Sequence, residues 1–172
     1  EAGLYLTGLF GQNMIYNVVS TGLYYYFQNV ICLPAVALGW IFAIARIWDA
    51  INDPMMGSIV DKTKTKWGKC KPYLLFAPIV ICVITCAAFL NGNYATEKMN
   101  NNSLATVLIV TWAAVSYVLW GMSYTAGDVP IWGVISRMSE IEKDRANLIA
   151  LARIVASIAA GLSIVSVVAL SQ

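Results

Sequence analysis

The stretch ARIWDAINDP (Ala45 to Pro54) decides the fold, because it places ionisable groups inside a segment that otherwise reads as membrane. Its surroundings are apolar on both sides, as in LGWIFAIARIWDAINDPMMGSIV (residues 38–60). An ionised side chain at the centre of a bilayer is costly, so a segment built for lipid avoids charge. Arg46, Asp49 and Asp53 therefore need an explanation other than contact with lipid.

Helical spacing puts these charges on one side of the segment. Arg46, Asp49, Asp53 and Gly57 follow the spacing i, i+3, i+7, i+11, which is a single stripe of a helix, and Asn52 lies beside it. Ionisable residues in a membrane helix usually face the interior of a bundle or a water-filled cavity. The stripe therefore predicts a polar site rather than a lipid-facing surface.

Two carboxylates one helical turn apart suggest a site for a small cation. Unpaired, Asp49 and Asp53 repel each other, and one of them tends to hold a proton. A hard cation such as Na⁺ prefers oxygen ligands, which the carboxylates and the Asn52 amide would supply. Pro54 would free a further carbonyl, four residues earlier. The alternative is that Arg46 simply neutralises Asp49 in a packed helix, with no ion.

The composition indicates a polytopic membrane protein. Of the 172 residues, 59% are hydrophobic and 12% are charged, against about 45–50% and about 25% in soluble domains. The net charge of +2 suggests no nucleic-acid partner, and the absence of histidine leaves proton chemistry near neutral pH to carboxylates. The sequence has no nucleotide motif, no nucleophile–base pair and no C-x-x-C pair, so we expect neither an enzyme nor a cofactor.

Five apolar windows are long enough to span a bilayer, which takes about 20 residues. They cover, approximately, residues 5–28, 36–60, 72–90, 104–135 and 148–170. The fourth window is too long for one straight span, and GDVP (Gly127 to Pro130) predicts a kink or break there. The chain has no initiator Met and ends as the fifth window finishes, so we expect it to be a piece of a longer protein.

The basic residues between the windows predict the orientation. DKTKTKWGKCK (residues 61–71) and RMSEIEKDRAN (residues 137–147) together hold eight of the eleven basic residues of the chain. Loops rich in Lys and Arg lie on the cytoplasmic side. These two loops, and with them the N-terminus, are therefore expected to be cytoplasmic.

Three of the windows bring charges to similar depths. At about 1.5 Å per residue, Asp49, Asp128 and Arg153 would lie roughly 18, 13 and 12 Å from the inner ends of their helices. Composition and spacing alone thus predict a polytopic helical membrane protein with a polar, ion-linked site.

Four motifs carry a resemblance to one transporter family. They are RIWDAINDPMMG (residues 46–57), WGKCKP (67–72), WGMSYTAGDVPIW (120–132) and ARIVAS (152–157). In order and spacing they are similar to the glycoside–pentoside–hexuronide:cation symporters of the major facilitator superfamily, of which the melibiose carrier is the best-known type. The resemblance implies symport of a sugar with a monovalent cation.

The resemblance also implies a fold. Members of this family are all-α membrane proteins with twelve spans in two six-helix halves, which alternate between inward-open and outward-open states around a central site. Residues 1–172 would supply the first five transmembrane helices of the N-terminal half, with the C-terminal half of the same transporter as partner. A multi-pass location in a bacterial inner (plasma) membrane is implied as well.

Two neighbouring sites follow from the resemblance. The cation-binding positions of the family correspond to Asp49, Asn52, Asp53 and Thr125. This set favours Na⁺ (or Li⁺), held by the two aspartates, with H⁺ as an alternative. The sugar-binding positions correspond to Gln12, Asn13, Asp128, Trp132 and Arg153. Carboxylates and guanidinium groups hydrogen-bond to hydroxyls, and an indole face packs on a sugar ring.

One pair of positions departs from the family pattern. The melibiose carrier has a Lys-Asp pair where this chain has Gln12 and Asn13, and that Asp binds sugar hydroxyls. An Asn still bonds hydroxyls but carries no charge, which argues against an α-galactoside substrate. It also leaves Arg153 less neutralised, which suits an anionic sugar such as a hexuronide.

The segment GSIVDKTKTKWGKCK, which begins at Gly57, resembles the loop between the second and third helices of the superfamily. Gly57 would allow close helix packing, while Asp61 and the lysines, Lys62 among them, would latch the inner face and gate alternation. Arg46 and Arg145 belong to the same group of expected gating and packing residues. The alternative is a solvated basic loop that only sets topology, and both interpretations can hold together.

Two other functions fit the same fold. A non-transporting sensor would be expected to have lost a site carboxylate or Arg153, and neither loss has occurred. A lipid-transporting branch of the family would favour a wider and more apolar cavity than these polar residues form. The prediction is therefore symport of a sugar with a cation.

Overall fold

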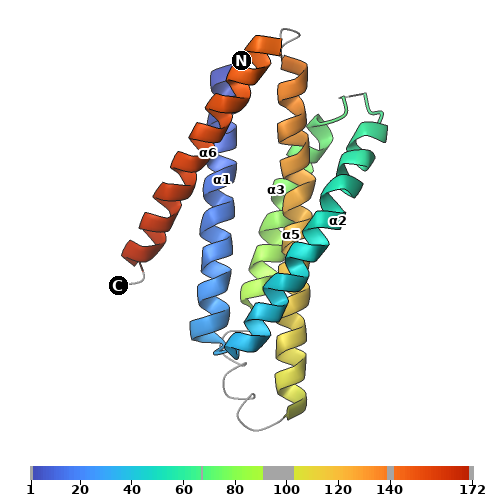
Figure 1. The fold of residues 1–172 in the computed structure, drawn as a ribbon. Coiled ribbons are helices and arrows are strands. Elements are labelled where there is room, and N and C mark those ends of the chain that lie inside the picture. The colour runs from blue at the N-terminus through green and yellow to red at the C-terminus, as the bar shows by residue number, and fades with distance from the viewer. Residues whose placement is uncertain (1, 67, 91–102, 139–141, 171–172) are drawn as a thin grey trace. The chain divides into compact units, whose positions relative to one another are not determined.

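The structure, a computed structural model, describes residues 2–66, 68–90, 103–138 and 142–170. Within these ranges the regular structure is helical throughout (Figure 1). The elements are α1 (Ala2–Tyr25), a π-helical turn η1 (Tyr26–Val30), α2 (Ala35–Lys62), α3 (Lys71–Phe89), α5 (Ser103–Met138) and α6 (Glu142–Leu170).

The largest differences from the predicted ranges are in α1, α5 and α6. The window over 5–28 is the helix Ala2–Tyr25 followed by the π turn, and the window over 148–170 begins earlier, at Glu142. Glu142 and Asp144 occupy the first turn of α6, where carboxylates are favourable because the helix dipole is positive there. The polar residues before 148 thus extend the helix.

No helix break occurs at residues 127–130. α5 runs unbroken from Ser103 to Met138 and keeps Pro130 in its interior. A proline removes one backbone hydrogen bond, and membrane helices tolerate this loss where neighbouring groups satisfy the freed carbonyl. The predicted break is therefore wrong, whereas a bend at this point stays a prediction.

Four of the described helices are long and apolar enough to cross a membrane. They are α2, α3, most of α5 and most of α6. α1 has 24 residues but is more polar, because Gln12, Asn13 and Asn17 lie along it. The first predicted span, residues 5–28, thus differs from the other four in composition, as expected if this helix lines a polar region.

The described chain forms two compact units. One comprises Glu1–Gly22 with Ile131–Gln172, and the other comprises Leu23–Pro130. The boundary between them falls within α5, directly after Pro130.

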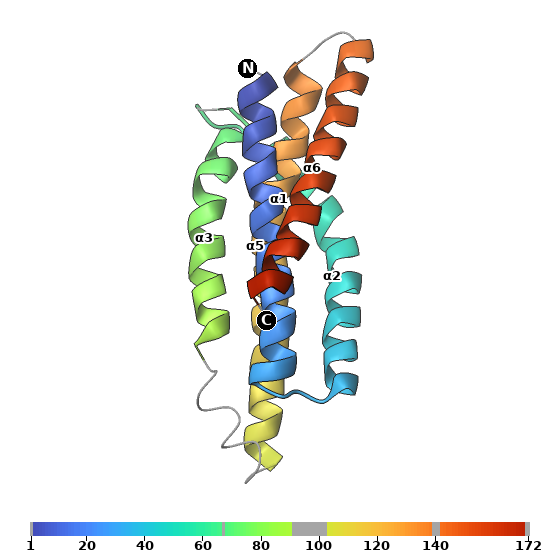
Figure 2. The ribbon, with the colours of Figure 1, turned by 90° about the vertical axis from the view of Figure 1, so that its left-hand side faces the viewer.

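The first unit packs α1 against α6 and the end of α5 (Figure 2). Its core consists of Leu9, Ile135 and Ala152, each nearly inaccessible to solvent. The Tyr5 hydroxyl donates a hydrogen bond to the Ile131 carbonyl at 3.1 Å. α6 buries a row of small side chains, Ala152, Ala159 and Ser163, and small residues let helix backbones approach closely in membranes.

In the second unit α5 lies between α2 and α3 (Figures 1 and 2). On the α3 side, a Cβ placed on Gly127 would be 3.3 Å from the Cβ of Ala77. On the α2 side, the rings of Phe42 and Tyr117 meet edge to face with centroids 4.8 Å apart. Tyr26 ties η1 to α3, because its hydroxyl donates to the Phe89 carbonyl at 3.0 Å. These contacts hold α2 and α3 against α5, which sets the register of the site described below.

Gly127 offers a test of the α3–α5 contact. We expect Gly127→Val to lower the free energy of unfolding by about 1–3 kcal/mol, because the added methyl groups would overfill a closely packed contact. Thermal unfolding of the purified protein in detergent measures the effect. The matched control is Gly161→Val in α6, where no atom lies within 4 Å of an added Cβ. Equal destabilisation by both variants would contradict close packing at Gly127.

Candidate functional site

α2 has two chemically different faces. Trp40, Ile44, Ile47 and Ile51 form an exposed apolar stripe along it. The charged stripe that begins at Arg46 lies on the opposite side, because each residue turns the helix by about 100°. The predicted separation of charge from the apolar surface is thus present in this helix.

The central contact of the site joins α2 to α5. The Thr125 hydroxyl lies 3.1 Å from Asp53 Oδ1 and also 3.1 Å from the carbonyl oxygen of Gly121. A hydroxyl has one hydrogen and two acceptor lone pairs, so it donates to only one of these oxygens at a time. Thr125 is buried, whereas Asp53 is exposed. One carboxylate oxygen is therefore bound to α5, and the rest of the group remains accessible.

Asp49 lies one turn earlier on α2 and faces Gly121. A Cβ placed on Gly121 would be 3.3 Å from Asp49 Oδ1, which is tighter than an ordinary van der Waals contact. The missing side chain thus leaves the space that the carboxylate occupies. The sequence analysis did not single out Gly121, although its position four residues before Thr125 puts it on the same face of α5.

Arg46 and Asp49 form a loose ion pair. Arg46 Nη1 lies 3.8 Å from Asp49 Oδ2, and the Arg46 side chain is 71% exposed. Exposed pairs of this kind contribute little to stability. Within the described residues Asp53 has no ion pair, so the two carboxylates are balanced by one guanidinium. The structural alternative, neutralisation by Arg46, therefore accounts for one of the two aspartates.

Asn52 completes the set and is deeply buried. Its side chain is 4% exposed, and among the described residues its Nδ2 has no hydrogen-bond partner. A buried amide without a partner costs about 1–3 kcal/mol. Such a cost is typical of sites where stability is given up for function. The groups on this face of α2 and α5 that carry oxygen atoms able to bind a cation are two carboxylates, an amide and a hydroxyl.

The predicted sugar-binding residues are divided between the two units. Asp128 belongs to the second unit, where Tyr124 donates a long hydrogen bond of 3.4 Å to its Oδ1. The indole of Trp120 stacks on Tyr124 with centroids 6.0 Å apart. Neither aromatic residue was predicted as part of the site. The spacing of four residues from Trp120 to Tyr124 to Asp128 could have indicated them, because it places all three on one face of the helix.

The other four predicted residues belong to the first unit: Gln12, Asn13, Trp132 and Arg153. Trp132 packs against the core around Leu9, and Asn13 Nδ2 donates to the Leu9 carbonyl at 3.0 Å. Arg153 is exposed and forms no ion pair with a described carboxylate. The meeting of this group with Asp128 in one sugar site stays a prediction.

The expected gating residues are less organised. Asp61 and Lys62 are exposed at the end of α2, and Arg145 is half-buried in the first turns of α6. No described atom lies within 4 Å of a Cβ placed on Gly57. The close helix packing expected at Gly57 is therefore not formed by the described part of the chain.

Comparison with known proteins places the chain among sugar transporters and symporters. The model for the family described as MFS/sugar transport protein matches residues 4–171. The isoprimeverose transporter of Lactiplantibacillus pentosus is 29% identical over 161 residues, which cover 94% of this chain and 31% of that protein. The uncharacterized symporter YjmB of Bacillus subtilis is 32% identical over 143 residues, or 82% of this chain and 29% of that protein.

A third relative has a more explicit name. The putative glycoside/cation symporter YagG of Escherichia coli is 30% identical over 126 residues, which cover 72% of this chain and 25% of that protein. The chain thus spans less than a third of the length of each of these three relatives.

Asn52 provides a test of the site by stability alone. We expect Asn52→Leu to leave the free energy of unfolding unchanged or to raise it by about 1–3 kcal/mol, because a side chain of similar size would replace a buried amide that lacks a partner. Denaturation of the purified protein without added Na⁺ measures this. Ser116→Leu in α5, where the buried hydroxyl donates to the Ala113 carbonyl, is the control and should destabilise. A clear loss of stability in Asn52→Leu would contradict an unsatisfied amide.

Proposed function

Because the chain belongs to the MFS/sugar transport protein family, we propose that it binds the coupling cation of a sugar–cation symporter and contributes part of the sugar site. Membership of this family and four helices of membrane-spanning length identify a multi-pass membrane protein of the transporter class rather than an enzyme. We further propose that the chain is the N-terminal part of such a symporter, inserted with its N-terminus in the cytoplasm.

The donor set on α2 and α5 supports a hard monovalent cation. The Thr125–Asp53 contact of 3.1 Å is the observation that carries the proposal, because it brings a hydroxyl from α5 to a carboxylate on α2. Asp49 and Asn52 extend the set with oxygen atoms on the same helix. All four groups offer the oxygen ligands that hard cations prefer. We propose Na⁺ as the ion, with Li⁺ as a substitute, and H⁺ as the alternative that Asp49 or Asp53 would bind.

The single hydrogen of the Thr125 hydroxyl gives the site a way to sense its ion. When the site is empty, the hydroxyl can donate to Asp53, which compensates part of the carboxylate's charge. When a cation occupies the site, the hydroxyl donates to the Gly121 carbonyl and turns a lone pair to the ion. Both acceptors lie at the same distance, 3.1 Å. Ion binding therefore exchanges one hydrogen bond for another without moving a helix.

Cation binding would be coupled to sugar through α5. Thr125 and Asp128 are three residues apart on this helix, and Trp132 follows one turn later. A cation that orders Thr125 would also bias Asp128, and reciprocity requires that sugar raise the affinity for the cation by the same factor.

The first unit supports an anionic sugar. Arg153 is exposed and has no ion pair with a described carboxylate, while Asn13 offers an amide where the melibiose carrier has an aspartate. An uncompensated guanidinium favours a ligand that carries a carboxylate, because the two groups match in charge and in hydrogen-bonding geometry. We therefore propose a hexuronide rather than a neutral galactoside.

The cation site is tested by charge removal at constant shape. We expect Asp53→Asn to abolish the increase in sugar affinity that Na⁺ causes, because the amide cannot balance the ion. Thr125→Val should weaken Na⁺ binding by about tenfold, because it removes one oxygen ligand, and Thr125→Ser should restore it. Isothermal titration of the full-length protein with a panel of glycosides, with and without Na⁺, measures both effects.

Asp144→Asn is the matched control, because Asp144 is an exposed carboxylate at the start of α6. It should bind sugar and Na⁺ as the parent protein does. Na⁺ stimulation that survives in Asp53→Asn would overturn the assignment. Sugar binding that follows pH and ignores Na⁺ would replace Na⁺ by H⁺, and an absence of any sugar binding would favour a sensor or a lipid carrier.

The substrate class is tested at Arg153. We expect Arg153→Gln to weaken binding of a glucuronide by at least tenfold and to change the affinity for the corresponding neutral glucoside much less, because only the first ligand offers a charged partner. Asn13→Asp should act in the same direction by partly neutralising Arg153. Parent protein that binds the neutral glucoside as well as the glucuronide, or better, would contradict the proposal.

A further inference from the structure

The segment between α2 and α3 carries a surplus of positive charge. Residues 61–71 contain five lysines and one acidic residue, a net charge of +4. Four of the lysines are exposed: Lys62, Lys64, Lys66 and Lys71. Within the described residues none of these lysines has an ion pair. The charge of the segment is therefore not compensated by the described chain.

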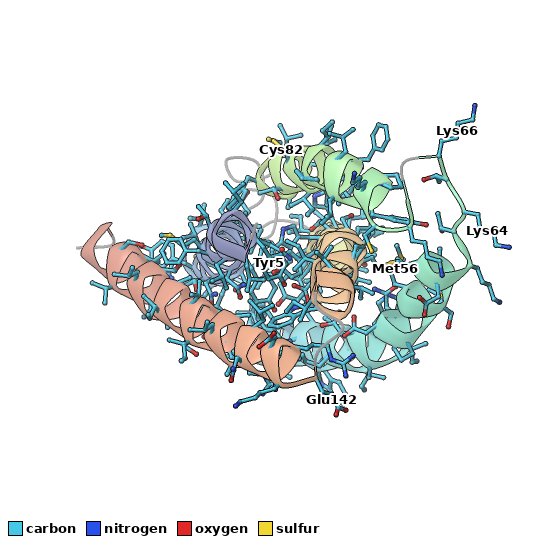
Figure 3. The ribbon with its side chains drawn as sticks, turned by 90° about the horizontal axis from the view of Figure 1, so that it is seen from above. Tyr5, Met56, Lys64, Lys66, Cys82 and Glu142 are labelled. Carbon is cyan, nitrogen blue, oxygen red and sulfur yellow. The ribbon has the colours of Figure 1, made fainter. Side chains whose placement is uncertain are left out.

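The segment is folded so that Lys64 and Lys66 point outward (Figure 3). After α2 ends at Lys62, Thr and Lys alternate from residue 63 to 66, and alternate side chains of an extended chain lie on opposite sides. The Thr63 hydroxyl lies 2.8 Å from the Tyr73 hydroxyl, and the Thr65 hydroxyl donates to the Gly68 carbonyl at 2.6 Å. Figure 3 shows Lys64 and Lys66 extending away from α2 and α3.

A tight turn holds the segment in this shape. Gly68 has φ +95°, a conformation that other residues rarely adopt, and its N–H donates to the Thr65 carbonyl at 3.1 Å. The two threonines and this turn leave the lysine side chains free to bind a ligand outside the helices.

Topology alone does not account for the surplus. The other predicted cytoplasmic segment, residues 137–145, has three basic and three acidic residues and so a net charge of zero. Orientation depends on the number of Lys and Arg residues near the membrane rather than on net charge. Either segment is basic enough to orient the protein, but only residues 61–71 can attract an anionic surface.

The two flanking helices keep the lysines near the membrane surface. α2 ends at Lys62 and α3 begins at Lys71, and both are of membrane-spanning length. Each connecting residue reaches at most about 3.6 Å, and electrostatic attraction to a charged surface extends about 8 Å at physiological ionic strength. A segment this short, fixed at both ends, places its ammonium groups at the level of the lipid headgroups.

We propose that the lysines of residues 61–71 bind the phosphate groups of anionic phospholipids, of the phosphatidylglycerol type, in the leaflet that this segment faces. The α2–α3 segment is then a lipid-binding surface in addition to any gating role. The proposal rests on the membrane insertion proposed above, but not on sugar or cation binding.

The test compares lipid selectivity in variants that remove or keep the charge of the segment. The full-length protein is placed in nanodiscs of phosphatidylcholine with increasing phosphatidylglycerol, and the lipids that remain bound are measured by native mass spectrometry. We expect Lys64→Gln with Lys66→Gln to lower the preference for phosphatidylglycerol by about fivefold for each lysine removed. Lys64→Arg with Lys66→Arg should retain the preference, because the charge is kept.

The control variant removes the same charge elsewhere: Lys143→Gln in the neutral segment together with Lys98→Gln, which lies outside the described residues. It should keep the preference for phosphatidylglycerol. In a separate control, soluble glycerol phosphate should displace bound phosphatidylglycerol no more than an equal ionic strength of salt does.

Three results would overturn the proposal. They are an unchanged preference in the Lys64→Gln, Lys66→Gln variant, an equal loss in the control variant, and a loss of thermal stability in pure phosphatidylcholine without any change in lipid preference. The last result would show that these lysines pair within the protein. The measurement contains neither sugar nor added Na⁺, so its outcome is independent of whether the symporter assignment holds.

Discussion

The contact between Asp53 and Thr125 is the constraint around which the second unit is built. A carboxylate in an apolar helix is costly unless another group compensates its charge, and α5 supplies a hydroxyl at 3.1 Å. Bringing that hydroxyl into range requires α5 to lie against α2, which the small residue Gly121 allows beside Asp49. The aromatic contact between Phe42 and Tyr117 holds the same two helices nearer the start of α2. The same approach of α5 to α2 therefore compensates the charge of Asp53 and packs the two helices together.

The site is not optimised for stability. The buried Asn52 Nδ2 has no hydrogen-bond partner in the described chain, and the ion pair of Arg46 with Asp49 is long at 3.8 Å. A protein that needed only to pack α2 would use apolar residues here, because replacing unsatisfied polar groups by apolar ones is neutral or stabilising. The long ion pair leaves oxygen atoms of Asp49 and Asp53 incompletely compensated, whereas the unpaired Asn52 Nδ2 is a hydrogen-bond donor and calls for an acceptor rather than a cation.

α5 gives the two predicted sites a common element. Gly121, Thr125 and Asp128 precede Pro130 on this helix, and Trp132 follows it. Residues at i and i+4 lie on the same face of a helix, and this spacing relates Gly121 to Thr125 and Asp128 to Trp132. The helix continues through the proline, and the two compact units divide directly after it.

The sequence by itself determined the membrane class, the helices and the stripe of charge on α2, because apolar length and a period of 3.6 residues are properties of a single segment. Through the family resemblance of motifs local to two helices, it also predicted Asp49, Asn52, Asp53 and Thr125 as cation-binding residues, and that assignment stays a prediction. Only the tertiary structure decided that Thr125 is bonded to Asp53, that Gly121 makes room for Asp49, and that Asn52 Nδ2 is buried without a hydrogen-bond partner among the described residues. These facts depend on the register between α2 and α5. Contacts of aromatic residues and glycines that are far apart in the chain set this register, and no local pattern encodes it.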